Sequence, residues 1–144
     1  RDVAPSRGLG DVYKRQRKVR YAMSFHGARY IHILVPCPLG WGAPSAKTIE
    51  LARLAHETGL FPVFEAEYGE VTNVSKIRRK QPVEKYLMLQ KRFAHLFGKK
   101  GNPEIVQRMQ ALADRNIARY GLLGDEQGDD IPVPEQAEER HHVI

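Results

Sequence analysis

Cysteine is nearly absent from this sequence. The chain of 144 residues contains one, Cys37. A single thiol excludes an internal disulfide and fits the reducing cytoplasm, where we expect the protein to reside. It also excludes a zinc or iron–sulfur centre built from the cysteines of this chain alone, because such centres need about four ligands.

Long apolar runs are missing as well. No stretch approaches the roughly 20 residues that a membrane-spanning helix needs, so we expect no membrane partner. The sequence has no internal repeat, and its basic excess is modest, with a formal net charge of +6. A length of 144 residues indicates one domain or part of one.

The first sixteen residues do not have the pattern of a natural protein. Residues 6–16 resemble the in-frame translation of a sequencing-library adapter that ends in a transposase recognition sequence, and Arg1 and Asp2 match adapter bases upstream. We therefore predict that residues 1–16 are adapter-derived and exclude them from the fold. They hold four of the 23 Lys/Arg and two of the 17 Asp/Glu, so the net charge without them is +4. The rest is expected to be a truncated piece of a longer chain.

Residues 17–67 show a pattern that alternates between helix and strand. The expected elements are a helix ending near residue 24, a strand over 30–35, a helix over 46–58 and a strand over 60–67. Ser45 is placed to cap the second helix and Gly59 to end it. Strand, helix and strand in this order predict a right-handed β-α-β unit and hence a parallel sheet. We therefore expect residues 17–67 to form the end of an α/β domain.

The remainder is predicted to be an extension followed by a tail. Residues 68–123 combine a basic loop, with a short strand expected at 70–74, and two helices over 82–97 and 103–123. Asn102 is a suitable N-cap for the last helix. Residues 124–144 are acidic and almost without apolar side chains, which is typical of a flexible tail.

A stiff turn follows the first expected strand and carries the cysteine. Pro36 and Pro38 constrain the backbone around Cys37, since proline fixes its own φ and restricts the residue before it. Open α/β sheets place their chemistry at the carboxyl ends of strands, which favours a site here. A free cysteine also packs as a small apolar side chain. A nucleophile needs a positioned histidine, which His32 on an alternating strand does not supply. The residues alone leave packing and chemistry open.

The strongest charge cluster is a basic run made by Lys76, Arg78, Arg79 and Lys80. Runs of this kind are often solvated surface. The alternative is a docking site for an acidic protein, a phosphate-bearing substrate or nucleic acid. No aromatic residue interrupts the run, so we expect no nucleic-acid partner. We treat these four side chains as a hypothetical docking site for an acidic partner protein.

The cysteine turn and its neighbours together match one family. Residues 27–42, with the element Pro-Cys-Pro-x-Gly-Trp, resemble the late part of the β subunit of 2-oxoacid:ferredoxin oxidoreductases, above all the pyruvate enzyme (pyruvate synthase). The resemblance covers about residues 24–123 and continues through four further segments, 45–53, 57–62, 82–87 and 90–93.

This resemblance implies a fold, an activity and a set of cofactors. The fold would be the C-terminal part of a thiamine-diphosphate-binding, doubly wound parallel-sheet α/β domain, followed by two helices and a polar tail. The whole enzyme would decarboxylate a 2-oxoacid with thiamine diphosphate and Mg²⁺, transfer the acyl group to coenzyme A, and pass electrons through [4Fe-4S] clusters to ferredoxin. Cys37 would be one ligand of the cluster nearest the thiamine, with Gly40 and Trp41 packing around it. The implied partners are an α subunit, ferredoxin-like γ/δ subunits and ferredoxin, and the basic run would dock either ferredoxin or the α subunit.

The chain departs from the family pattern in what it lacks. The other three cluster cysteines and the residues that hold magnesium diphosphate lie upstream in the family and are missing here. We therefore expect this chain alone to bind neither group and to be inactive. The alternatives are an enzyme for another 2-oxoacid, such as 2-oxoisovalerate, another thiamine-dependent decarboxylase or transketolase relative, or a non-catalytic basic binding module.

Overall fold

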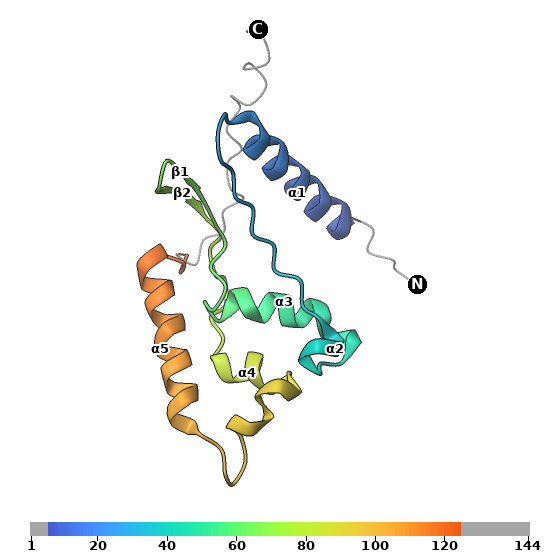
Figure 1. Cartoon of the computed structure of the whole chain (residues 1–144), viewed down its shortest axis with the longest axis vertical. Coiled ribbons are helices and arrows are strands. Elements are labelled where there is room, and N and C mark those ends of the chain that lie inside the picture. Colours follow the sequence, from blue (N-terminus) through green and yellow to red (C-terminus); the bar gives the residue numbers. More distant parts are fainter. Residues whose placement is uncertain (1–5, 125–144) are drawn as a thin grey trace, which may run out of the picture. The chain divides into compact units, whose positions relative to one another are not determined.

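The structure is a computed structural model that describes residues 6–124 (Figure 1). The chain divides into two compact units, of which the first includes residues up to Ile33 and the second begins at Leu34. The described part combines helices with one small two-stranded sheet, so it mixes α-helices and β-strands, in keeping with the expected class in this broad sense. The expected acidic tail lies outside the described residues from 125 onward.

The first unit is built on the helix α1, Ser6–Ser24. The expected helix end near residue 24 is confirmed, and the helix also includes residues 6–16 of the stretch predicted to be adapter-derived. A bend follows, in which Gly27 has a φ of +103° and the Arg29 side chain donates from Nε to the Phe25 carbonyl at 2.7 Å. Beyond this bend the chain runs extended.

The expected strand over 30–35 is wrong for this structure. Residues 28–37 have no regular secondary structure, and the side chains of Tyr30 and Val35 are 86% and 71% exposed. An extended segment becomes a strand only when it forms a β-ladder with a neighbour, and neither the ladder nor the isolated bridge among the described residues includes this segment. The β-α-β unit and the parallel sheet are therefore not formed within residues 6–124.

The sheet that does form is an antiparallel hairpin. Strand β1, Phe64–Glu67, pairs with β2, Glu70–Val74, and the register shifts between Glu65 and Ala66. Tyr68 and Gly69 turn the chain with φ values of +52° and +89°, as a two-residue hairpin loop requires. The short strand expected at 70–74 is confirmed, whereas the strand expected over 60–67 is correct only in its second half.

Three short helices follow the extended segment in place of a loop and one helix. They are α2, Pro38–Trp41, the 3-10 helix η1, Ser45–Lys47, and α3, Thr48–Glu57. The helix expected over 46–58 is therefore largely confirmed, but Ser45 is not its side-chain cap. Instead the Ser45 carbonyl accepts a hydrogen bond from the hydroxyl of Thr48 at 2.8 Å.

The helix expected over 82–97 is broken in the middle. It becomes α4, Val83–Met88, and a 3-10 helix η2, Lys91–Leu96. At the break, the side-chain Nε2 of Gln90 donates to the Tyr86 carbonyl at 2.7 Å, while its backbone amide donates to the Leu87 carbonyl at 3.0 Å. The Gln90 backbone then leaves the helical region, with φ −122° and ψ 115°.

The last helix, α5, spans Pro103–Tyr120 and begins as predicted. The side-chain oxygen of Asn102 accepts a hydrogen bond from the Ile105 amide at 3.3 Å, which confirms Asn102 as the N-cap. The helix ends at Tyr120, three residues before the expected end at residue 123, and Gly121 follows it with a φ of +57°. This earlier end allows Leu122 to turn inward and become fully buried.

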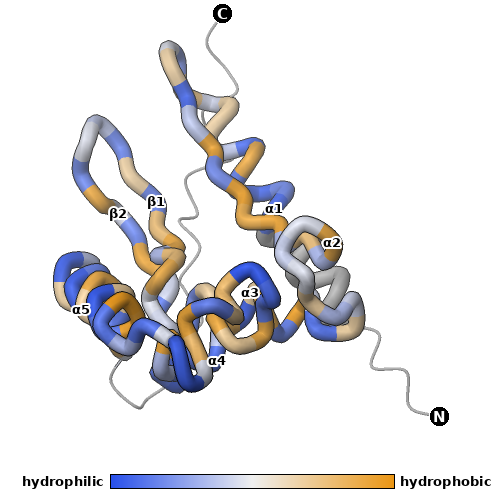
Figure 2. The backbone as a smooth tube through the Cα atoms, turned by 60° about the horizontal axis from the view of Figure 1, so that its bottom comes forward, coloured by the Kyte–Doolittle hydropathy of each residue, from blue (hydrophilic) through white to orange (hydrophobic). Residues whose placement is uncertain are grey.

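The core of the second unit lies where α3, α4 and α5 meet, and apolar segments of these helices are orange in Figure 2. Its buried residues are Leu51, Leu54, Ala55, Val83, Tyr86, Leu87, Leu96 and Ala113. A smaller cluster of Ile77, Ile117 and Leu122 joins the segment after β2 to the end of α5. Burial of these apolar side chains is the main force that holds the second unit together.

Candidate functional site

The cysteine turn, residues 35–43, places Cys37 at the N-cap of α2. The side chain is exposed, and its Sγ accepts a hydrogen bond from the Gly40 amide at 3.3 Å. A Cβ added at Gly40 would lie 3.3 Å from this sulfur, so a larger residue there would crowd it. Gly40 therefore lies directly beside the Cys37 sulfur, whereas the expected packing of Gly40 and Trp41 around a cluster stays a prediction.

Backbone hydrogen bonds close the cysteine turn on itself. The Trp41 amide donates to the Cys37 carbonyl at 3.0 Å, and the Ala43 amide donates to the Pro38 carbonyl at 2.9 Å. Gly42 ends the helical turn with a φ of +62°, in the left-handed region that glycine adopts readily. With proline on both sides of Cys37, these bonds hold the sulfur on a short and constrained segment.

The cysteine turn also rests on the segment that follows α4. Trp41 packs half-buried against the core, and the Arg92 guanidinium carbon lies 4.2 Å from the centre of its ring. The Gly42 carbonyl accepts a hydrogen bond from the Lys91 amide at 3.4 Å, and a Cβ at Gly42 would come within 2.8 Å of the Lys91 Cβ. Trp41 therefore anchors the turn that carries Cys37.

The side chains available as ligands limit which metal centre the cysteine turn can hold. No described residues form a group of three or more His, Cys, Asp or Glu side chains that could hold a metal ion. Cys37 is the one thiol of the sequence, whereas a [4Fe-4S] cluster takes four cysteine ligands. This chain could therefore supply at most one cysteine ligand of such a cluster.

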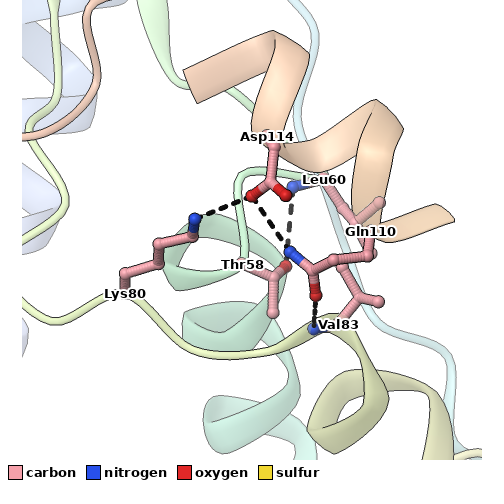
Figure 3. A network of polar contacts seen from close by, with 6 residues as sticks. All are labelled: Thr58, Leu60, Lys80, Val83, Gln110 and Asp114. Atoms are coloured by element: carbon pink, nitrogen blue, oxygen red, sulfur yellow. Dashed lines mark hydrogen bonds and ion pairs between the residues drawn. The ribbon is translucent and has the colours of Figure 1, made fainter. Parts of the chain in front are cut away.

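Part of the basic run packs against the rest of the second unit. Between its charged residues, Ile77 is buried, and its amide donates to the Leu122 carbonyl at 2.7 Å. Lys76 Nζ donates to the Gly121 carbonyl at 2.6 Å, and Lys80 Nζ lies 2.7 Å from Asp114 Oδ1 (Figure 3). These two lysines therefore bind the run to α5, which the sequence did not indicate.

Arg78 and Arg79 are the two members of the run that stay outside these contacts. Both are exposed, and no described acidic residue forms an ion pair with either. Buried Ile77 anchors the backbone next to them. A docking surface at this place would therefore consist of two arginines rather than four cations.

Arg92 is a residue of this site that the sequence interpretation missed. It follows the Gln90 break and meets Trp41 only because the cysteine turn folds onto η2. Its position in a helix expected over 82–97 suggested nothing more than an exposed charge. The contact is a tertiary one, and no spacing rule within a helix predicts it.

The comparison with protein families finds no family model that matches the chain. Curated relatives are nevertheless similar to it. It is 49% identical over 106 residues to the pyruvate synthase subunit PorB of Methanosarcina barkeri, and 43% identical over 106 residues to the subunit of that name from Methanocaldococcus jannaschii. Both matches cover 74% of this chain.

A second group of relatives carries a different name. The chain is 39% identical over 94 residues to the ketoisovalerate oxidoreductase subunit VorB of Pyrococcus abyssi, a match that covers 64% of the chain. The chain spans about a third of the length of these curated relatives, 36%, 34% and 30% for the three. Among the described residues, no helix has the length and apolarity needed to cross a membrane.

Proposed function

Because the chain belongs to the family of 2-oxoacid:ferredoxin oxidoreductase β subunits, we propose that it forms the C-terminal part of such a subunit in a pyruvate-type enzyme. The complete enzyme would convert a 2-oxoacid and coenzyme A into acyl-CoA, CO₂ and a proton. The two electrons released would pass through [4Fe-4S] clusters to ferredoxin. The α subunit and ferredoxin-like γ/δ subunits would complete the assembly.

The observation that carries this proposal is the Cys37 thiol on its constrained turn. The sulfur is exposed, sits at the end of an extended segment, and accepts a hydrogen bond from the Gly40 amide. Hydrogen bonds to cluster sulfurs stabilise the reduced, more negative state and so tune the reduction potential. In this proposal Cys37 supplies one ligand, Gly40 leaves space and a donor beside it, and Trp41 anchors the turn.

Thiamine diphosphate and Mg²⁺ supply the decarboxylation chemistry when they are bound in the complete enzyme. We assign the binding of these groups to no described residue, and the proposed contribution of this chain is to electron transfer and assembly.

The Cys37→Ala variant of the complete enzyme tests the proposed ligand. We expect it to lose about four iron atoms per β subunit, one [4Fe-4S] cluster, together with the corresponding electron paramagnetic resonance signal. Leu39→Ala is the matched control, because Leu39 lies on the same turn and is 95% exposed. Wild-type iron content and signals in Cys37→Ala would reject the proposal.

Pyruvate is the proposed substrate, because the relatives of higher identity carry the name pyruvate synthase. The ketoisovalerate relatives make the branched 2-oxoacid the alternative. Steady-state kcat/KM for pyruvate and for 2-oxoisovalerate, measured side by side on the complete enzyme, distinguishes them. A higher value for 2-oxoisovalerate would overturn the substrate assignment.

The extended segment 28–35 is the proposed link to a doubly wound parallel sheet. Its alternate apolar side chains, Ile31, Ile33 and Val35, are exposed, and the segment belongs to no strand among the described residues. In the complete subunit this segment would gain a neighbouring strand on at least one side. Hydrogen exchange of the amides of residues 30–35 in the complete enzyme tests this, and unprotected exchange there would contradict it.

A further inference from the structure

Arg92 makes three contacts that converge near the cysteine turn. Its guanidinium carbon lies 4.2 Å from the centre of the Trp41 ring and 4.7 Å from that of the Phe93 ring. Its Nε donates to the side-chain oxygen of Gln90 at 2.8 Å. An exposed arginine held by a hydrogen bond and by two aromatic rings has much less freedom than a solvated one.

One partner of Arg92, Gln90, is buried in the core. The residue is only 1% exposed, and its amide nitrogen donates to the Tyr86 carbonyl at 2.7 Å. With its amide nitrogen bound in this way, the Gln90 side chain presents its oxygen to Arg92. The hydrogen bond between Gln90 and Arg92 therefore connects the end of α4 with the contact between Arg92 and Trp41.

The contact matters because Trp41 belongs to the turn that carries Cys37. The Trp41 amide donates to the Cys37 carbonyl, so a displacement of the indole pulls on the backbone at the cysteine. The Gly42 carbonyl is held in turn by the Lys91 amide, next to Arg92. Arg92 thus contacts the cysteine turn through the Trp41 side chain, and Lys91 contacts it through the Gly42 backbone carbonyl.

We propose that Arg92 is a positioning residue for Cys37: packed on Trp41 and oriented by Gln90, it determines the geometry with which the Cys37 sulfur ligates its cluster. The effect on the cluster rests on the proposed function, in which Cys37 is a cluster ligand. The contact by which Arg92 restrains the cysteine turn does not depend on that proposal. Both aspects are tested separately in the complete enzyme.

The first measurement concerns the turn itself. Hydrogen exchange of a peptide covering residues 39–43 is compared for wild type, Arg92→Gln and Arg92→Lys in enzyme freed of its clusters. Loss of the cation–π contact is expected to accelerate exchange roughly twofold to fivefold in Arg92→Gln. Arg92→Lys retains the charge but not the planar stacking or the Nε donor, so we expect an intermediate rate.

The second measurement concerns the cluster. We expect Arg92→Gln to retain the cluster of the complete enzyme but to change its electron paramagnetic resonance line shape and its reduction potential, with partial rescue in Arg92→Lys. Arg108→Gln is the matched control for loss of one positive charge, because Arg108 lies on α5 in an exposed pair with Glu104. This control is expected to match the wild type in both measurements.

The outcomes separate the two proposals. Unchanged exchange in Arg92→Gln would overturn the positioning role. Faster exchange with an unchanged cluster signal, in an enzyme whose cluster depends on Cys37, would reduce Arg92 to a structural residue and would also overturn it. If Cys37→Ala keeps its cluster while Arg92→Gln still exchanges faster, the ligand proposal fails and the contact between Arg92 and the turn stands.

Discussion

Lys80 Nζ lies 2.7 Å from Asp114 Oδ1 and so ties the end of the basic run to the middle of α5 (Figure 3). Gln110 supports the same carboxylate, since its Nε2 donates to Asp114 Oδ1 at 3.1 Å. Its Oε1 accepts a hydrogen bond from the Val83 amide at 3.0 Å, at the start of α4. One polar network therefore connects the basic run, α4 and α5.

We predict that Lys80→Ala destabilises the protein modestly. Both side chains of the pair are nearly half exposed, 44% and 47%, so the ion pair is worth about 0.2–1 kcal/mol. Arg108→Ala, which breaks the more exposed pair with Glu104, is the comparison and is expected to have a smaller effect. The free energy of unfolding from urea titration measures both, and an equal loss in the two variants would contradict the prediction.

The same pair predicts a dependence of stability on pH. The hydrogen bond from Lys80 lowers the pKa of Asp114 below its ordinary value, and Gln110 acts in the same direction. A lowered pKa in the folded state stabilises the protein above the pKa of the unfolded state, which is about 3.9. This contribution is lost as pH falls through the lower folded-state pKa. We expect Asp114→Asn to remove it, so that the stability difference from wild type shrinks below about pH 4.

Gly59→Ala is predicted to be strongly destabilising. Gly59 has a φ of +78°, and a Cβ there would lie 2.6 Å from Ile117 Cγ1 and 3.0 Å from the Ala113 carbonyl oxygen. The left-handed backbone costs about 1–2 kcal/mol for a residue with a Cβ, and the overlap with α5 adds about 1–3 kcal/mol. Gly69→Ala is the matched control, since φ there is +89° with no atom within 4 Å. Equal losses of unfolding free energy would show that the overlap has no effect.

Leu87→Ala tests the location of the core. Leu87 is fully buried in the cluster formed by α3, α4 and α5, so its truncation should cost about 2–5 kcal/mol. The control is Leu39→Ala, the same substitution at a side chain that is 95% exposed, for which we expect a change within about 0.5 kcal/mol. Thermal or chemical unfolding measures both. A small effect at Leu87 would mean that this cluster does not hold the protein together.

Charge reversal at Arg78 and Arg79 tests the proposed docking surface. In the complete enzyme the double variant Arg78→Glu, Arg79→Glu should slow electron transfer to ferredoxin, most at low ionic strength, or weaken assembly with the α subunit. Lys99→Glu, Lys100→Glu is a control with the same change in charge, at another exposed place. Unchanged electron transfer and salt dependence would exclude a role in ferredoxin docking, and intact assembly would exclude the subunit interface.

The elements that the sequence predicted well are those with local causes. The side chain of Asn102 caps α5 by accepting a hydrogen bond from the Ile105 amide, three residues further on, and Gly59 follows α3 with a left-handed φ. Both depend on residues within a few positions, so the signal is present in the sequence. The strand over 30–35 failed for the opposite reason, because a strand is defined by a partner that the described residues do not provide.

The candidate site was predictable in part. Cys37, Gly40 and Trp41 form a recognisable local pattern, and the structure places them on one closed turn. The break at Gln90 could not be predicted, because the Gln90 side chain takes the place of its backbone amide at the Tyr86 carbonyl. The packing of Arg92 on Trp41 could not be predicted either, because the two residues come from segments far apart in the chain.

By itself, the sequence determined the family, the cysteine turn, the cap of α5 and the limit of one thiol, since each depends on residue identity or short spacing. Tertiary structure alone decided which cations of the basic run remain at the surface and what holds the cysteine turn. Those two outcomes follow from contacts between segments far apart in the chain, where burial and a few directed hydrogen bonds select one arrangement among many that the local pattern permits.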